Sequence, residues 1–320
     1  MISPRLSVSS SERIKTLLTQ IRSATEATAL ANGDGIAAER AEAASTPVGA
    51  VNEELMGLSS YRRIKALEEN FDERFDALVS SLKKLIKTVF TRENLVLAVA
   101  GEAPEGYAEQ IVSLFPEGVS EAREHQFPKI PKKQGIKLPV RVGHSALSFI
   151  SPQARELFGP LKVAGNILSF EYLWTQVRLR GGAYGAGMSS RRTGQIIFSS
   201  YRDPKPKRSI DVFMGAGRFL REFLDGSPDL SGYIIGAVGD FDILKTPRAS
   251  AFQATADYIL GWDGDMDAKL LSDILSCDRE ALYKVCDMLD REICNGAYCA
   301  VGSQELLSEL TEAEIISPRE

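Results

Sequence analysis

The chain has 320 residues, of which 44% are hydrophobic and 25% charged, and its formal net charge at pH 7 is -5. A chain of this length can bury a sizeable core, and about two domains are expected. The acidic balance leaves no basic excess of the kind that a phosphate backbone requires, so we expect no nucleic-acid partner.

Hydropathy and the N-terminal segment indicate the cellular compartment of the chain. No apolar stretch approaches the roughly 18 uninterrupted residues of a membrane span, and the N-terminus lacks the apolar core of a secretory signal. We therefore expect no membrane partner and a cytoplasmic location. The organellar matrix is the alternative, because the first 22 residues carry four basic side chains against the single acid Glu12, as a transit peptide would. We interpret this segment as an ordinary amphipathic helix.

All four cysteines lie near the C-terminus, at Cys277, Cys286, Cys294 and Cys299. Their spacing matches neither a C-x-x-C zinc site nor a secreted disulfide framework. We interpret them as small buried apolar side chains in a reducing compartment.

Residues 1–101 are predicted to form a mainly helical partial domain, because apolar residues recur three and four positions apart. A long stripe of this kind between residues 61 and 89 predicts two helices that meet near Asn70. The one strand predicted here spans residues 95–100, an apolar run typical of a strand buried on both faces.

Residues 102–137 contain four prolines and many charges with few periodic apolar positions, which indicates an interdomain linker. The pattern over 138–320 predicts a second, complete domain. Its predicted strands lie around Val140 and at 183–189, 194–201 and 298–301. Its predicted helices lie at 161–177, 209–224, 247–260, 266–276 and 279–293 and from Gln304 onward, and residues 233–241 suit either a strand or a helix. This order predicts an α+β fold in which helices pack on a mainly antiparallel sheet.

The residues for autonomous peptide hydrolysis are missing. An inverted zincin requires H-x-x-E-H, whose two histidines hold zinc while the glutamate activates water. The only two histidines, His125 and His144, have neither glutamate nor a second histidine at that spacing, so we expect surface or loop residues. The G-x-S-x-G elbow of serine hydrolases is also absent, and no spacing supports a Cys-His pair. We expect no metal or cofactor to be bound by this chain.

Arg178 and Tyr184 are the candidate binding residues, one at a predicted helix end and the other beyond a glycine pair. Arginine offers a planar fork of donors for carbonyls or a carboxylate, and tyrosine offers a hydroxyl that can donate to a developing oxyanion. The residues alone also allow a structural interpretation, in which Arg178 is solvated at the helix end and Tyr184 packs on a sheet.

A motif around these residues resembles a known family. The sequence Y-L-W-T-Q-V-R-L-R-G-G-A-Y-G-A at 172–186, followed by F-S-S-Y-R-D-P at 198–204, is similar to the C-terminal half of pitrilysin/insulinase-type metallopeptidases, in their presequence-protease and falcilysin branch. Residues 49–58 and the helices after them look like the end of the family's third domain. Residues from 138 onward, including the strand at 298–302, look like its fourth domain.

This resemblance implies a clamshell of four related domains of the mitochondrial-processing-peptidase type, enclosing a chamber where unfolded peptides are cut. The zinc lies in the N-terminal half, which would be the partner of this chain. Carried over by motif, Tyr184 would hydrogen-bond the scissile carbonyl oxygen and Arg178 a neighbouring substrate carbonyl. Gly181, Gly182 and Gly185 would shape the loop between them.

One departure from the family pattern limits what this chain can do alone. A family half contains two complete domains, whereas residues 1–101 offer one strand, which cannot form a stable sheet. Either the chain is a piece of a longer polypeptide, or another chain completes the sheet, or the first domain is degenerate. We therefore expect a non-catalytic half that assists a zinc-bearing half, with a proteolytically inactive structural or peptide-binding homologue as the alternative. A hydrolase using its own cysteine or serine has little support.

Overall fold

The computed structural model describes residues 11–99, 101–102, 104–118, 125–241 and 245–318. Contacts divide the chain into two units that interleave along the sequence, and each is described by itself. The first unit comprises residues 1–23, 63–126 and 244–264, and the second comprises 24–62, 127–243 and 265–320. Residues 1–10 of the predicted N-terminal segment lie outside the described residues, whereas the expected helix that follows is present as α1 (Ser11–Ala31).

Helices make up the regular structure that is described for the first unit. Helix α4 (Leu58–Glu69) enters it from the second unit and is followed by α5 (Phe71–Val89), so the two predicted helices do meet at Asn70. The remaining elements are η1 (Arg92–Asn94), α6 (Tyr107–Ser113) and α12 (Pro247–Leu260). Within this unit Glu68 pairs with Arg22 and accepts a hydrogen bond from the Thr19 hydroxyl at 2.7 Å, which ties α1 to α4.

The strand predicted at 95–100 is wrong for the part that the structure describes. Residues 95–99 are irregular, and Val96, Leu97 and Val99 are exposed rather than buried on both faces. An apolar run forms a buried strand only where neighbouring strands accept its hydrogen bonds, and the described residues of this unit contain no other strand.

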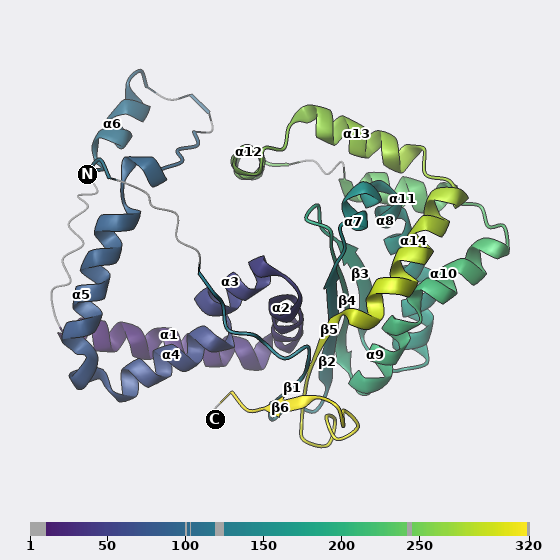
Figure 1. Ribbon diagram of the computed structural model, residues 1–320, viewed down its shortest axis with the longest axis horizontal. Helices are drawn as coiled ribbons and strands as arrows, with labels where there is room; N and C mark the ends of the chain where they lie inside the picture. Colours follow the sequence, from purple (N-terminus) through teal and green to yellow (C-terminus); the bar gives the residue numbers. More distant parts are fainter. Residues whose placement is uncertain (1–10, 100, 103, 119–124, 242–244, 319–320) are drawn as a thin grey trace. The chain divides into compact units, whose positions relative to one another are not determined.

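A six-stranded mixed sheet forms the centre of the second unit (Figure 1), in the order β3-β4-β2-β5-β1-β6. Its strands are β1 (Lys133–Lys137), β2 (Gly143–Ile150), β3 (Gly185–Ser190), β4 (Gln195–Asp203), β5 (Ala297–Gly302) and β6 (Glu314–Ile316). The pairs β3–β4, β4–β2 and β2–β5 are antiparallel, whereas β1 pairs parallel with both β5 and β6. The predicted α+β fold with a mainly antiparallel sheet is confirmed.

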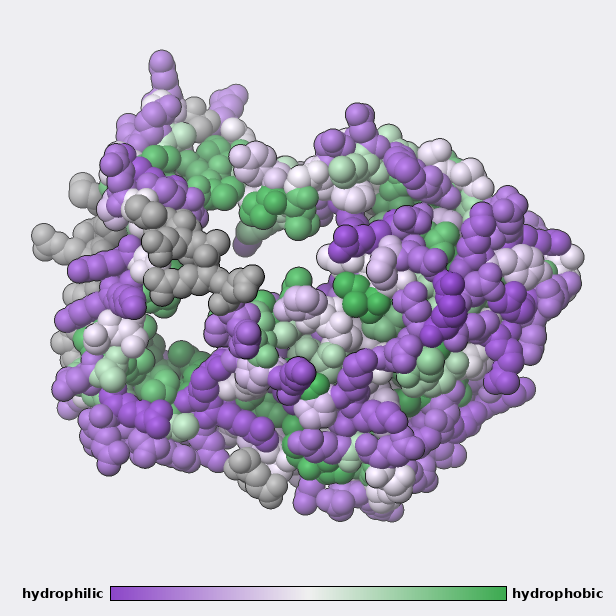
Figure 2. Space-filling model, viewed as in Figure 1, coloured by the Kyte–Doolittle hydropathy of each residue, from purple (hydrophilic) through white to green (hydrophobic). Residues whose placement is uncertain are grey.

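One face of this sheet carries the larger core. Leu147 and Phe149 on β2 and Phe198 on β4 are buried there with apolar side chains from the helices. These helices are α7 (Gln153–Glu156), α8 (Phe158–Ile167), α9 (Pro206–Met214), α10 (Ala216–Asp225), α11 (Ser231–Phe241), α13 (Gly264–Leu275) and α14 (Arg279–Glu292), with the π-helix η2 (Leu168–Leu179) and the short η3 (Ile293–Asn295). Leu220 and Leu224 bury one side of α10, while the surface over that helix is mostly hydrophilic (Figure 2).

The opposite face of the sheet is covered by α2 (Gly33–Ser45), to which α3 (Pro47–Met56) is joined (Figure 1). Because side chains alternate along a strand, Ala146 points to this face while its neighbour Leu147 points to the larger core. Ala146, Cys299 and Val301 form a small second core with Ala37 and Ala41 of α2.

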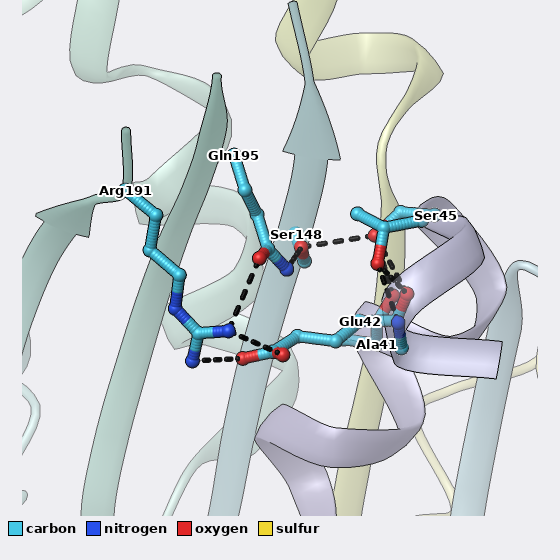
Figure 3. Close-up of polar contacts among 8 residues, drawn as sticks. Ala41, Glu42, Ser45, Ser148, Arg191 and Gln195 are labelled. Atoms are coloured by element: carbon cyan, nitrogen blue, oxygen red, sulfur yellow. Dashed lines mark hydrogen bonds and ion pairs between the residues drawn. The ribbon is translucent and has the colours of Figure 1, made fainter. Parts of the chain in front are cut away.

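Polar contacts fix α2 on the sheet (Figure 3). Arg191, which follows β3, donates from both terminal nitrogens to the two carboxylate oxygens of Glu42, each at 2.9 Å. The Ser45 hydroxyl donates to Ser148 of β2 at 2.9 Å, and Gln195 of β4 donates to the same Ser148 oxygen at 3.2 Å. A two-pronged arginine–carboxylate pair fixes orientation as well as distance, so α2 is held in one register on β2 and on the residue that follows β3.

A buried ion pair lies under the same helix. The Arg40 guanidinium donates to Glu53 of α3 at 2.5 Å and to the Gln134 side chain of β1, and the side chains of Arg40 and Glu53 are 7% and 1% exposed. The same Glu53 oxygen accepts from the backbone N–H and the hydroxyl of Ser59 at 2.8 and 3.0 Å. Charges buried this deeply are tolerated only when paired, so each partner depends on the other.

Most helices and strands predicted after residue 138 are present within a few residues, and 233–241 is resolved as a helix. The strand predicted around Val140 is displaced to β2, because the Val140 N–H donates to the Leu138 carbonyl in a tight turn at 2.8 Å. The helix predicted at 209–224 is divided at Gly215 into α9 and α10.

The C-terminal segment differs from the prediction. From Gln304 the chain makes turns with three-residue hydrogen bonds, such as Leu310 N–H to Leu307 carbonyl at 3.0 Å, and then enters β6. These turns replace the predicted final helix, because the short segment must bring the chain back beside β1.

The predicted division into domains at 1–101 and 138–320, with a linker at 102–137, stays a prediction, because a grouping by contacts does not test which segments fold on their own. One local feature of the linker is new, since its last five residues form β1. In the described part of the chain, no helix is both long and apolar enough to cross a membrane.

The buried ion pair generates a stability prediction. Arg40→Met leaves the Glu53 charge buried without its cation, which costs about 3–5 kcal/mol of unfolding free energy. Adding Glu53→Gln removes that charge and keeps an acceptor for Ser59, so the double variant recovers most of the loss. Urea unfolding of the two variants measures both effects, and a double variant no more stable than Arg40→Met contradicts this explanation.

Candidate functional site

The helix that carries Arg178 changes its geometry before it ends. Its second half is the π-helix η2, in which the Arg180 N–H donates to the Thr175 carbonyl, five residues back, at 3.0 Å. π-helical turns are rare in proteins, and those that occur are often found at functional sites. Arg178 lies in the last turn, where its guanidinium carbon is 3.8 Å from the ring centroid of Trp174, so the planar cation is stacked on the indole.

A glycine pair reverses the chain directly after this helix. The N–H groups of Gly182 and Ala183 donate to the carbonyls of Arg178 and Val177 at 2.9 and 3.2 Å. Gly182 has φ +87°, a left-handed value that favours glycine. A Cβ on Gly181 would lie only 2.3 Å from the Val177 carbonyl oxygen. Both glycines are therefore required for the turn, whereas a Cβ on Gly185, inside β3, would meet open space.

Tyr184 follows the turn and leads into β3. Its N–H donates to the carbonyls of Tyr201 and Arg202 at 3.0 and 3.3 Å, and its ring meets the Tyr201 ring edge-on at 5.9 Å. The side chain is 66% exposed, and the guanidinium carbon of Arg178 lies 5.9 Å from its ring centroid. The structure thus brings the two predicted donors together on one surface.

The polar ends of both side chains are available to a ligand. Among the described residues, neither the Arg178 guanidinium nor the Tyr184 hydroxyl takes part in a hydrogen bond or an ion pair. Because the Tyr184 side chain is mostly exposed, it does not belong to the core, unlike in the structural interpretation in which it packs on the sheet. The arrangement can offer two hydrogen-bond donors, one charged and one neutral, to acceptors a few ångströms apart.

Residues at the end of β4 contact Tyr184 and hold it in place. Arg202 has φ +47°, a left-handed conformation that is strained for a residue with a side chain. The next residue, Asp203, is fully buried and accepts from the Ser200 hydroxyl at 2.6 Å and from the Lys205 N–H at 2.8 Å. The Ser200 hydroxyl also lies 2.7 Å from that of Ser145 on β2. These contacts hold the end of β4, where Arg202 lies opposite the irregularity of β2 between Gly143 and Ser145.

His144 is not the loop or surface residue expected from the sequence. It lies in β2 and is 8% exposed, because the start of α2 closes over its ring. Its Nδ1 accepts the Arg202 N–H at 3.4 Å, and its ring centroid lies 5.3 Å from that of Tyr201. Burial lowers the pKa of His144, an effect that Asp34 and Asp203 partly offset. Sequence reasoning missed this residue because a single histidine beside a glycine carries no spacing signal.

The described residues form no metal-binding cluster, and three of the four cysteines are unsuited to nucleophilic chemistry. No group of three or more His, Cys, Asp or Glu side chains there could hold a metal ion. Cys277, Cys286 and Cys299 are buried, as expected, and burial raises the pKa of each thiol to about 12. Such thiols stay protonated at neutral pH and are poor nucleophiles. Cys294 is exposed, which corrects the expectation for that residue.

Models of two protein families match most of the chain. The family model described as PreP C-terminal domain matches residues 138–303, more than half of the chain. A second model, described as associated with subfamily C of the M16 peptidases, matches residues 2–67. The first match contains both segments of the candidate site.

Several curated proteins are similar over most of this chain. Presequence protease 1, chloroplastic/mitochondrial, of Arabidopsis thaliana is 26% identical over 302 residues, which cover 92% of this chain and 28% of that protein. Protein HypA of Clostridium perfringens is 25% identical and covers 93% of this chain and 31% of its own length. The mitochondrial presequence protease of Saccharomyces cerevisiae is 25% identical, covering 88% and 30%. The chain therefore spans less than a third of the length of these relatives.

Solved structures give a more distant likeness. The peptidase M16 inactive domain from Pseudomonas fluorescens superposes with a TM-score of 0.49 at 17% identity, covering 69% of this chain and 56% of its own. Pitrilysin superposes with a TM-score of 0.45 at 17% identity, covering 68% and 25%.

The glycine turn generates a prediction with an internal control. Gly181→Ala forces a Cβ against the Val177 carbonyl and is expected to cost about 2 kcal/mol or more of unfolding free energy. Gly182→Ala is expected to cost about 1–2 kcal/mol, because alanine must adopt a left-handed conformation. Gly185→Ala is the control and should stay within about 0.5 kcal/mol. Denaturant unfolding ranks the three variants, and equal losses at Gly181 and Gly185 would refute the assignment.

Proposed function

The chain belongs to the family of the PreP C-terminal domain and corresponds to the C-terminal half of a pitrilysin-type peptidase; on this premise we propose that it binds unfolded peptides and assists their cleavage by a zinc-bearing half. The observation that carries the proposal is the pair of Arg178 and Tyr184. Tyr184 is exposed and Arg178 is half-buried on either side of a turn that requires two glycines, and neither donor has a partner among the described residues.

The closeness of the two side chains suits contact with one extended peptide. Carbonyls on the same side of an extended chain repeat every two residues, or about 6.8 Å. The Arg178 guanidinium carbon lies 5.9 Å from the centroid of the Tyr184 ring, so both side chains would meet the same stretch of such a peptide. The Tyr184 hydroxyl would donate to the scissile carbonyl oxygen and stabilise the charge that develops there. Arg178 would hold a neighbouring carbonyl of the same peptide.

Stacking on Trp174 prepares Arg178 for this role. A guanidinium held 3.8 Å from the indole centroid keeps its plane while its edges remain open to a ligand. Lysine cannot reproduce this geometry, because its ammonium is a point charge on a flexible stem. The stacked arginine would therefore lose little conformational freedom when a peptide binds.

Positive charge gathers around the site. The two segments that build it, residues 176–184 and 201–208, contain six basic residues and one acid, Asp203, giving +5 within a chain of net charge -5. Asp203 is buried, and Lys207 pairs with Asp211. Within the described chain, no ion pair engages the side chains of Arg178, Arg180, Arg202 or Lys205. A bound peptide would gain from carboxylates placed next to this surface.

Hydrolysis itself would belong to the other half. The described residues offer no ligand set for zinc, and the chain spans less than a third of its curated relatives, so the missing length can supply that set. The partner we propose is the N-terminal half with H-x-x-E-H, on the same or another polypeptide. The names of the Arabidopsis and yeast relatives favour the organellar alternative for location over the cytoplasm.

The alternative is a homologue that binds peptides or another protein without supporting cleavage. It is favoured by the first unit, whose described residues form helices but no sheet. The two functions share the donors at Arg178 and Tyr184, so peptide binding alone does not separate them. Gain of turnover with a zinc-bearing half does.

Reconstitution tests the transition-state role of Tyr184. When the chain is mixed with a zinc-bearing half, Tyr184→Phe should lower kcat on the order of a hundredfold with a small change in KM, because an oxyanion donor is lost and the ring is kept. The control is Tyr258→Phe, which alters an exposed tyrosine of α12. If turnover is the same with Tyr184→Phe as with wild type, the role is wrong; if no zinc-bearing half restores turnover, the inactive alternative stands.

The positive charge around the site generates a prediction about peptide affinity. At low salt, a peptide with glutamates should bind the 320-residue chain several-fold more tightly than its glutamine counterpart, and the difference should shrink at about 0.5 M salt. Arg180→Gln should reduce the preference, whereas Lys284→Gln on α14 should not. Fluorescence anisotropy measures the affinity of each peptide for wild type and for the two variants, and equal binding of both peptides to wild type at low salt would count against an electrostatic contribution.

A further inference from the structure

A continuous set of contacts leads from His144 to Tyr184. The His144 ring lies against Tyr201 at 5.3 Å between centroids, and Tyr201 in turn meets the ring of Tyr184 at 5.9 Å. A backbone route runs beside it, because His144 accepts the Arg202 N–H and Arg202 accepts the Tyr184 N–H. Tyr184 is thus supported by Tyr201 and Arg202. His144, which is buried, contacts both of these residues.

The intermediate residue is under strain. Arg202 adopts φ +47°, which costs a residue with a Cβ about 1–2 kcal/mol. Such a conformation persists only where the surroundings over-determine it. On one side Asp203 accepts from Ser200 and Lys205, and on the other side His144 receives the Arg202 N–H.

We propose that His144 is a positioning residue for Tyr184, holding Arg202 in its left-handed conformation so that the Arg202 carbonyl and the Tyr201 ring fix the Tyr184 side chain on the surface. The inference deepens the proposed function and rests on it for its catalytic consequence. It requires the neutral imidazole, because only an unprotonated Nδ1 can accept the Arg202 N–H.

The surroundings of His144 favour that neutral form. Gly33 at the start of α2 leaves no room beside the ring, since a Cβ there would lie 2.7 Å from His144 Cδ2. The charged groups that face the ring are Asp34 from α2 and Arg202 and Asp203 from the end of β4. Burial is the largest influence and lowers the pKa, so water and counter-charge do not stabilise an imidazolium enough to offset it.

The pH dependence follows from this direction. The unfolded chain binds a proton at His144 near the ordinary pKa of 6.5, whereas the folded chain does so only at lower pH. The contribution of His144 to stability is therefore complete above pH 6.5 and is lost as the pH falls from 6.5 through the lowered pKa. Over the same range a protonated Nδ1 becomes a donor, and the Arg202 N–H loses its acceptor.

Two variants of the full chain separate the hydrogen bond from the packing. His144→Phe keeps a ring against Tyr201 but has no acceptor, while His144→Asn places an amide oxygen near Nδ1 and does not titrate. We expect hydrogen exchange at the Arg202 and Tyr184 amides to become about tenfold faster in His144→Phe at pH 7.5, in line with one lost hydrogen bond. His144→Asn should stay within about threefold of wild type.

The reference amides are Leu147 and Phe198, which lie paired in the middle of β2 and β4. Their exchange should not change, and acceleration there equal to that at Tyr184 would show a general loss of stability and overturn the proposal. If His144→Phe does not fold, His144→Asn decides. After correction for intrinsic rates, lowering the pH from 7 to 5 should weaken protection of the Tyr184 amide in wild type and not in His144→Asn, and identical behaviour refutes the inference.

Turnover in the reconstituted enzyme adds the functional readout. We expect His144→Phe to lower kcat about tenfold with little change in KM, and His144→Asn to remain within about threefold of wild type at neutral pH. Exchange at Tyr184 is measured on this chain alone, so it tests positioning even if Tyr184→Phe shows that the proposed function is wrong. Altered exchange without altered kcat would retain His144 as a structural support and reject its catalytic consequence.

Discussion

The central sheet of the second unit is apolar on both faces, and the need to cover both is the constraint on which the rest of the structure depends. Strand β5 is buried along its whole length and β2 along all but its last residue. The layer from α7 to α11, with α14, covers one face, and α2 covers the other. Because α2 precedes the sheet by about a hundred residues, this second cover joins two distant parts of the chain. The buried Arg40–Glu53 pair and the Arg191–Glu42 pair then fix its register.

The candidate site lies where the backbone of this unit departs from regular helix and strand geometry. A π-helix ends at Leu179, a turn requires Gly181 and Gly182, and Arg202 adopts a left-handed conformation. Each departure costs free energy that the surrounding contacts must offset. Together they bring two donors close to each other that have no partners in the described chain, which is what a ligand site needs and a stable core does not.

On the proposed function, the site is half of a catalytic arrangement. Two donors can orient a peptide and stabilise developing charge, but the described residues contain no activated nucleophile and no metal ligand set. The buried thiols are held protonated, which argues against cysteine chemistry. On the proposed function, the chain depends on groups from another half, and its own contribution rests on how firmly it holds Arg178 and Tyr184. In the proposed positioning role, His144 adds to that firmness without touching the peptide.

The sequence by itself determined the features that depend on neighbours along the chain. These are the helices recognised by their period, the glycine turn, the pairing of Arg178 with Tyr184 and the α+β class. It missed β1 and β6, predicted a strand at 95–100 that is not formed over the described residues 95–99, predicted a final helix that is not formed, and made His144 a surface or loop residue. Only the tertiary structure decided these points, because a short segment becomes a strand when distant strands accept its hydrogen bonds, and a histidine becomes buried when a helix from elsewhere closes over it.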